Sequence, residues 1–197
     1  MKHTPTPEQQ AIIDLAITSK ENILVNALAG AAKTSTLEMI AQKLTSEPIL
    51  FLAFNKRIAD EAQKRLPSHV EVKTLNALGH RVWGKVCNRQ LVLKNSKMSD
   101  LYHEYLSSLK GAARNRAWEE RNDILDLLRL AKRDGYVPPG SRAIAGGWFV
   151  GEEWREGIED EVEDRVQEVV CQLLTKSIVM AYNGVIDFDD QLYMPVC

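Results

Sequence analysis

The sequence lacks several features that would assign it to a broad class of protein. No apolar run approaches the ~20 residues that a transmembrane helix needs. The first ten residues, MKHTPTPEQQ, contain no signal-peptide core. The three cysteines (Cys87, Cys171 and Cys197) form no CxxC pair, which argues against a disulfide framework and a zinc site. These absences predict a protein of the reducing cytoplasm that has no membrane partner.

The chain also lacks an overall basic charge, because 27 Asp and Glu oppose its 25 Lys and Arg. The charges are nevertheless unevenly distributed. Residues 54–97 contain ten Lys or Arg and three Asp or Glu, whereas residues 152–168 contain nine Asp or Glu and two Lys or Arg. A local basic face can bind a nucleic-acid backbone even on a mildly acidic protein. A solvated helix surface is the alternative interpretation.

A phosphate-binding loop is the clearest motif that the sequence does contain. Residues 23–44, ILVNALAGAAKTSTLEMIAQKL, comprise an apolar run, a small-residue loop, a Lys-Thr pair and an amphipathic segment. In such loops, backbone N–H groups and the N-terminus of the next helix face a polyphosphate. Lys33 is expected to reach the β- and γ-phosphates and Thr34 to bind Mg²⁺. The predicted loop residues are Ala27, Leu28, Ala29, Gly30, Ala31, Ala32, Lys33, Thr34 and Ser35.

This loop is poor in glycine. Gly30 is its only glycine, and Ala32 and Leu28 occupy positions at which the usual pattern has glycine. If residue 32 needs a positive φ, its methyl group costs roughly 1–2 kcal/mol. The loop is therefore expected to follow a slightly different path.

Secondary-structure signals divide the chain into an α/β part and a helical part. Thr6, Pro7 and Gln9 predict a capped helix that runs to about residue 18. Strands are expected at residues 22–26, 49–54 and 70–73, and helices at 33–44, 55–66, 75–86, 98–110, 114–134 and 152–182. The apolar run 49–54 is typical of a parallel strand covered on both faces. Residues 134–151 are rich in Gly and Pro and predict a loop.

Five short stretches, in this order, resemble motifs of the UvrD/Rep-type superfamily 1 DNA helicases, in their phage and bacterial form. They are TPEQQAI (6–12), ALAGAAKT (27–34), AFNKRIADE (53–61), TLNALGHRVW (74–83) and GVIDFDDQLYMP (184–195). The resemblance implies an α/β fold with a RecA-like P-loop NTPase core, its parallel sheet partial, in residues 1–87. It further implies an all-helical inserted subdomain in residues 88–183 and a return to the core at 184–197.

The resemblance also implies roles for individual residues. Lys33 and Thr34 match the catalytic residues that bind the phosphates of ATP and Mg²⁺. Gln9 matches the glutamine that reads adenine, although completing the helix cap is an equally good role from the residues alone. Single-stranded DNA would be contacted by Phe54, Asn55, Lys56, Thr74 and Asn76. Stacking on a base is the implied role of Phe54, and core packing is its alternative.

The function implied is that of an ATP-dependent DNA helicase that moves along single-stranded DNA and meets single-strand/duplex junctions. In the family, the acidic pair of motif II and the second motor domain follow the stretch matched here. The chain is therefore expected to be the ATP-binding N-terminal portion and to be inactive by itself. Asp187, Asp189 and Asp190 are interpreted as structural residues, not as that acidic pair. The alternatives are a truncated, non-catalytic nucleotide- or DNA-binding module or helicase partner, and a small kinase.

Overall fold

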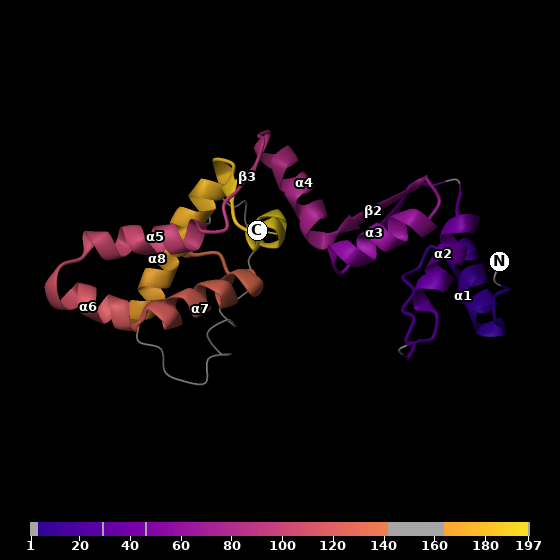
Figure 1. Cartoon of the computed structure of the whole chain (residues 1–197), viewed down its shortest axis with the longest axis horizontal. Coiled ribbons are helices and arrows are strands. Elements are labelled where there is room, and N and C mark those ends of the chain that lie inside the picture. Colours follow the sequence, from indigo (N-terminus) through magenta and orange to yellow (C-terminus); the bar gives the residue numbers. More distant parts are fainter. Residues whose placement is uncertain (1–3, 29, 46, 142–163, 197) are drawn as a thin grey trace. The chain divides into compact units, whose positions relative to one another are not determined.

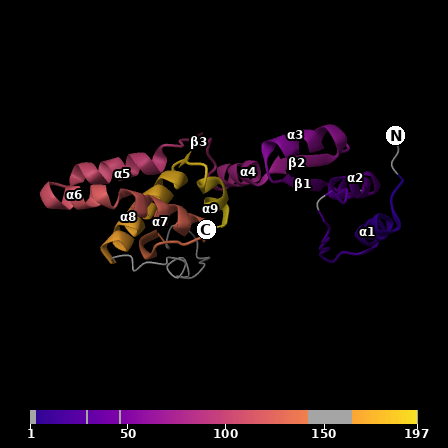
Figure 2. The ribbon, with the colours of Figure 1, turned by 60° about the horizontal axis from the view of Figure 1, so that its bottom comes forward.

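The computed structural model describes residues 4–28, 30–45, 47–141 and 164–196. The chain divides into two compact units, Met1–Leu75 and Asn76–Cys197, and Figures 1 and 2 show the elements of each. Its structure is mixed α/β, mostly helical, with short parallel strands. Residues 152–163, where the last predicted helix begins, lie outside the described residues.

The first unit contains a β-α-β crossover beside a pair of helices. Helix α1 (Pro7–Thr18) packs against α2 (Lys33–Lys43). Strand β1 (Ile49–Ala53) leads through α3 (Lys56–Arg65) to β2 (Val70–Thr74). The two strands are parallel, with Ile49 opposite Val70 and Ala53 opposite Thr74. Because the strands are parallel, their carboxyl ends lie at the same edge of the sheet.

The small core of the first unit covers one face of β1. Alternate residues of a strand point to opposite faces. Ile49 and Phe51 pack against a cluster made by Ala41, Ala62, Leu66 and Val70. Leu50 and Leu52, on the other face, are 41% and 43% exposed. The prediction that this strand is covered on both faces is therefore wrong for the described residues.

The strand predicted at residues 22–26 is not formed. This segment has no regular secondary structure, and Leu24 is 94% exposed. A strand is stable when a neighbouring strand satisfies its N–H and C=O groups. In the described part of the first unit, only β1 and β2 pair with each other. The apolar run Ile-Leu-Val therefore has no strand to join.

The second unit is a helical cluster around α8. Its helices are α4 (Leu75–Cys87), α5 (Lys97–Ser108), α6 (Gly111–Glu119), α7 (Arg121–Arg133), α8 (Asp164–Tyr182) and α9 (Asp190–Val196), with a 3₁₀ turn, η1 (Pro139–Ser141). The helix predicted over 114–134 is thus two helices that divide at Glu120. In α8, Val170, Leu174, Ile178 and Ala181 are fully buried at helical spacing, which makes this helix the centre of the core. No helix in the described ranges is long and apolar enough to cross a bilayer.

Two very short strands join the ends of this helical cluster. Strand β3 (Val92–Leu93) pairs in parallel with β4 (Val185–Ile186), although the two lie far apart in the sequence. Two-residue strands carry no periodicity, so the sequence did not predict them.

Helix α4 belongs to the second unit by its packing. The ring nitrogen of buried Trp83 donates to the carbonyl of Ala181, at 3.0 Å. At Gly79, an added Cβ would lie 1.7 Å from the backbone oxygen of Gln191 in α9, so only glycine permits this approach. The compact units therefore divide before α4, whereas the division after residue 87 rests on motifs and stays a prediction.

Candidate functional site

The start of α1 is linked directly to α2 through Gln9. The backbone N–H of Gln9 donates to the Thr6 hydroxyl, and its side-chain oxygen accepts from the Thr6 N–H, which confirms the predicted cap. Its amide nitrogen donates to the hydroxyl of Thr36 in α2, at 3.0 Å. An amide oxygen has a second lone pair and an amide nitrogen a second hydrogen. Gln9 can therefore hold the cap and still offer a donor and an acceptor.

The loop before α2 turns through two left-handed residues. Gly30 has a φ of 82°, and Ala32, at the N-cap of α2, has a φ of 54° and a ψ of 33°. The N–H of Ala31 donates to the carbonyl of Leu28, at 3.2 Å. Position 32 thus needs the positive φ considered for it above, at a cost of roughly 1–2 kcal/mol for alanine.

Lys33 folds back over this loop. Its ammonium group donates to the carbonyls of Ala27 and Leu28, at 2.9 and 2.7 Å. A lysine in the first turn opposes the helix dipole, and these two carbonyls offset that cost. The N-cap residue of α2 makes no side-chain hydrogen bond, so the first N–H groups of the helix have no cap. An ammonium beside uncapped helical N–H groups is a donor set suited to a polyanion.

A cavity of about 660 Å³ lies among α1, this loop and α2. Its polar lining includes Gln9, Lys33 and Thr36, and its apolar lining includes Ile12 and Ile40. A volume of this size, with a few polar groups over an apolar wall, is typical of small-molecule sites.

The remaining predicted loop residues differ in how they relate to this cavity. Gly30, Ala31 and Ala32 line it, and so does Ala27. Thr34 is exposed in the first turn of α2 and is not part of this lining, and Ala29 lies outside the described residues. The sequence did not single out Thr36, because a hydroxyl in the first turn of a helix is a common feature with no distinctive spacing.

Most of the predicted DNA contacts gather at the carboxyl edge of the β1–β2 pair. Phe54 directly follows β1 and is 89% exposed, so the core-packing alternative is wrong. Asn55 caps α3 by accepting from the N–H of Ile58, at 2.9 Å, and the exposed Lys56 begins that helix. Thr74 ends β2 opposite Ala53, at the same edge. These residues thus combine an exposed ring with polar and cationic groups.

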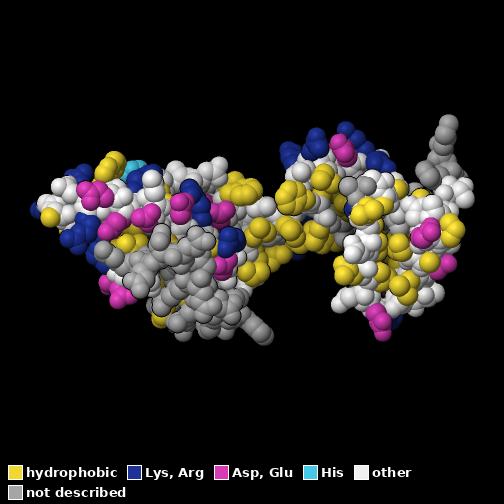
Figure 3. Space-filling model, turned by 90° about the horizontal axis from the view of Figure 1, so that it is seen from below, with side chains coloured by type: hydrophobic (Ala, Val, Ile, Leu, Met, Phe, Trp, Pro, Cys, Tyr) yellow, Lys and Arg dark blue, Asp and Glu magenta, His cyan; other side chains and the backbone are white. Residues whose placement is uncertain are grey.

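The surface of the first unit mixes charge and apolar side chains. In Figure 3, dark blue Lys and Arg side chains gather along one border of this unit beside yellow hydrophobic ones. Helix α3 contributes Lys56, Arg57, Lys64 and Arg65, against Asp60 and Glu61. The basic stretch predicted from residue 54 onwards therefore begins with a helix of net positive charge.

Asn76, the last predicted DNA contact, belongs to the second unit. It lies in the first turn of α4, and its amide donates to the carbonyl of Phe188, at 3.3 Å. The structure thus groups Asn76 with the turn before α9, apart from the edge that holds the other four residues.

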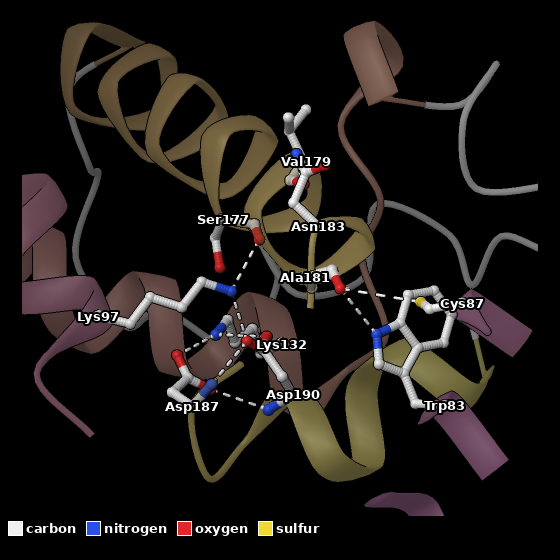
Figure 4. Close-up of polar contacts among 10 residues, drawn as sticks. All are labelled: Trp83, Cys87, Lys97, Lys132, Ser177, Val179, Ala181, Asn183, Asp187 and Asp190. Carbon is white, nitrogen blue, oxygen red and sulfur yellow. Dashed lines mark hydrogen bonds and ion pairs between the residues drawn. The ribbon is translucent and has the colours of Figure 1, made fainter. Parts of the chain in front are cut away.

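Buried ion pairs hold that turn, as Figure 4 shows. Lys132 of α7 lies 2.6 Å from the carboxylate of Asp187 and 2.8 Å from that of Asp190. Lys97 of α5 lies 2.5 Å from Asp190 and donates to the carbonyl of Ser177, at 2.7 Å. These contacts support a structural role for Asp187 and Asp190. The two lysines were not predicted, because a single lysine in a helix carries no sequence signal for burial.

The paired charges alter the acidity of these groups. Burial alone would raise the pKa of Asp190, but the ammonium groups of Lys132 and Lys97 outweigh it and lower that pKa. Burial lowers the pKa of Lys97, which has to share Asp190 with Lys132. Asp189 faces outward, and burial together with neighbouring Asp187 raises its pKa.

Comparison with known proteins gives a consistent assignment. The chain is 34% identical over 94 residues to F-box DNA helicase 1 of Gallus gallus, a match that covers 48% of the chain and 9% of that protein. It is 33% identical over 75 residues to F-box DNA helicase protein 1 of Schizosaccharomyces pombe, covering 38% of the chain and 8% of that protein. The matched stretch is thus less than a tenth of each relative.

No solved structure matches the chain. The sequence model for the UvrD/REP helicase N-terminal domain matches residues 6–195, which include all five motif stretches described above. Because this match spans nearly the whole chain, the protein belongs to the UvrD/REP helicase N-terminal domain family.

Proposed function

We propose that this chain is the ATP-binding portion of an ATP-dependent DNA helicase that moves along single-stranded DNA. One observation carries the proposal. The ammonium group of Lys33 lies against the loop carbonyls of Ala27 and Leu28, at the uncapped start of α2 and beside a nucleotide-sized cavity. A RecA-like core is part of this proposal, and the parallel β1–α3–β2 crossover supports it.

The residues around the cavity divide the work of binding ATP. Lys33 exchanges its carbonyl contacts for phosphate oxygens, and the first N–H groups of α2 donate to the same phosphates. The spare donor and acceptor of the Gln9 amide suit one edge of adenine. Thr34 would hold Mg²⁺, which neutralises phosphate charge when bound. Within the described ranges, no group of three or more His, Cys, Asp or Glu gathers as a metal site, so the phosphates themselves would supply other ligands.

Single-stranded DNA is proposed to bind at the carboxyl edge of the β1–β2 pair. The exposed ring of Phe54 offers a stacking platform, and Asn55, Lys56 and Thr74 offer polar and cationic groups for phosphates. Asn76 is the proposed contact in the second unit. Junctions of single and double strands, a second motor domain and a cytoplasmic setting complete the proposal.

The direct test is titration of the chain with a fluorescent ATP analogue and Mg²⁺, beside Lys33→Ala. We expect saturable binding that is at least about tenfold weaker in the variant, because a hydrogen bond to a charged group is worth about 1.5–3 kcal/mol. Lys43→Ala is the matched control. Lys43 is an exposed lysine at the other end of α2, and its removal is expected to leave the affinity unchanged.

Two results would count against the nucleotide site. Equal affinities for the wild type and Lys33→Ala would show that the analogue binds elsewhere. A folded wild-type chain that binds no analogue would remove the ATP-binding proposal and leave DNA binding to be judged separately.

Nucleotide and DNA binding without turnover is a second candidate. The buried pairing of Asp187 and Asp190 favours it, because these carboxylates already bind Lys132 and Lys97 and are not free to activate water. The rate of phosphate release with and without single-stranded DNA separates the two candidates. Stimulated turnover by this chain would exclude the second one.

A further inference from the structure

An open, positively charged groove lies along the C-terminal half of α4, in the second unit. Its volume is about 610 Å³, and its lining includes Arg81, Lys85 and Arg89. No Asp or Glu is among the described residues that line it. The groove belongs to neither the nucleotide cavity nor the Phe54 edge, both of which lie in the first unit.

The end of α4 is built so that Arg89 turns back beside this helix. Asn88 has a φ of 49°, its N–H donates to the carbonyl of Lys85, and the N–H of Arg89 donates to the carbonyl of Gly84. This pair of hydrogen bonds, with a left-handed Asn, is the Schellman motif. The Arg89 side chain also runs past Gly184, where its carbons lie 3.8 Å from the position of an added Cβ. The direction of Arg89 is therefore fixed by backbone geometry.

The cations of this groove are regularly spaced. Arg81 and Lys85 are one helical turn apart, which is about 6 Å along the axis, and Arg89 follows after the turn. Lys85 and Arg89 are exposed, and in the part of the chain that the structure describes neither pairs with a carboxylate. Cations near a helix C-terminus interact favourably with its dipole. That effect does not require three of them to line one open groove.

We propose that this groove is a second nucleic-acid contact, which binds the phosphodiester backbone and does not read bases. The groove is open and elongated, which suits a linear polyanion better than a single small anion. Its lining has no Phe, Tyr or Trp, so it offers no platform for base stacking. This inference rests on the DNA-binding part of the proposed function and extends it to the second unit.

The test is the salt dependence of DNA binding by the whole chain, measured by fluorescence anisotropy with an oligothymidylate. In Lys85→Gln/Arg89→Gln, the slope of log K against log salt is expected to fall by about 2, one unit for each lost phosphate contact. The affinity at about 50 mM salt is expected to fall on the order of tenfold. Lys110→Gln/Arg114→Gln removes the same charges from exposed positions around α6 and should keep the wild-type slope.

The outcomes separate this inference from the function on which it rests. If both double variants lose affinity and slope equally, net charge explains binding and the groove is not a site. If Lys85→Gln/Arg89→Gln binds as the wild type does, the inference is wrong, whereas DNA binding at Phe54 survives. A wild-type chain that binds no DNA would overturn both. Phe54→Ala should weaken binding without changing the slope, because stacking releases no counterions.

Discussion

Two non-glycine residues of the described chain have a positive φ, and each lies at the end of a helix. Ala32 precedes α2 and Asn88 follows α4. Asparagine tolerates the left-handed region because its short polar side chain can bond locally. Alanine has no such compensation, so the backbone strain falls on the candidate nucleotide loop. Strain held at a loop beside a cavity is typical of functional sites.

Replacing Ala32 by glycine should relieve this strain. The left-handed conformation costs alanine roughly 1–2 kcal/mol, and the greater freedom of glycine in the unfolded chain returns about 0.4–1 kcal/mol of that gain. We therefore expect Ala32→Gly to raise the free energy of unfolding by up to about 1 kcal/mol, measured by urea denaturation.

Ala31→Gly is the matched control for this prediction. Ala31 is exposed in the same loop but does not have a positive φ, so only the entropic cost of glycine applies. We expect this control to lower the free energy of unfolding by about 0.4–1 kcal/mol. Equal losses in both variants would mean that Ala32 is not strained.

At the scale of elements, local signals placed the helix ends well. Thr6 caps α1 and Asn55 caps α3, each close to the predicted start. The split between α6 and α7 at Glu120 was missed, since no Gly or Pro marks it. The close approach of α4 to α9 was also missed, because Gly79 acquires its importance only from a neighbour distant in sequence.

That close approach predicts opposite effects for two glycines of α4. In Gly79→Ala, the new methyl group would overlap the Gln191 carbonyl, so α9 has to move. We expect a loss of about 1–3 kcal/mol in the free energy of unfolding, the usual range for overpacking. In Gly84→Ala, the methyl group would lie 3.5 Å from the nearest atom, an ordinary contact.

Gly84→Ala is therefore expected to be neutral or to stabilise by up to about 1 kcal/mol, because alanine has the higher helix propensity. Thermal unfolding followed by circular dichroism measures both variants. Similar unfolding temperatures for Gly79→Ala and Gly84→Ala would contradict the packing of α4 against α9.

At the scale of the whole molecule, the second unit is held together by charge as well as by apolar burial. Lys97 from α5 and Lys132 from α7 meet the turn that starts α9, and all four charged side chains of this cluster are at least nine-tenths buried. A buried pair is costly to break, because the partner that remains is left unpaired. The cluster therefore fixes how α9 joins the helical core.

Asp190→Asn tests this cluster. Removing the carboxylate leaves Lys97 with the Ser177 carbonyl as its remaining acceptor, so we expect a loss of about 3–5 kcal/mol in the free energy of unfolding. Asp189→Asn, one residue away and exposed, should be neutral or slightly stabilising, since its carboxylate has a raised pKa. Chemical denaturation of both variants gives the comparison.

The same pair predicts a dependence on pH. The folded state lowers the pKa of Asp190, so its stabilising contribution is present above the ordinary Asp pKa of about 4 and is lost as the pH falls through the lower, folded value. The stability difference between the wild type and Asp190→Asn should therefore shrink in acid. A difference that stays constant down to about pH 2 would contradict the pairing.

The sequence by itself determined the helix ends, the parallel pair β1–β2 and the Gly-Ala-Ala-Lys-Thr loop, because each depends on residues within one or two turns. Only the tertiary structure decided that residues 22–26 form no strand, that Gln9 bonds Thr36, and that Lys97 and Lys132 are buried. These outcomes depend on partners far along the chain. A strand needs a neighbour and a buried charge needs an opposite charge, and composition and periodicity record neither.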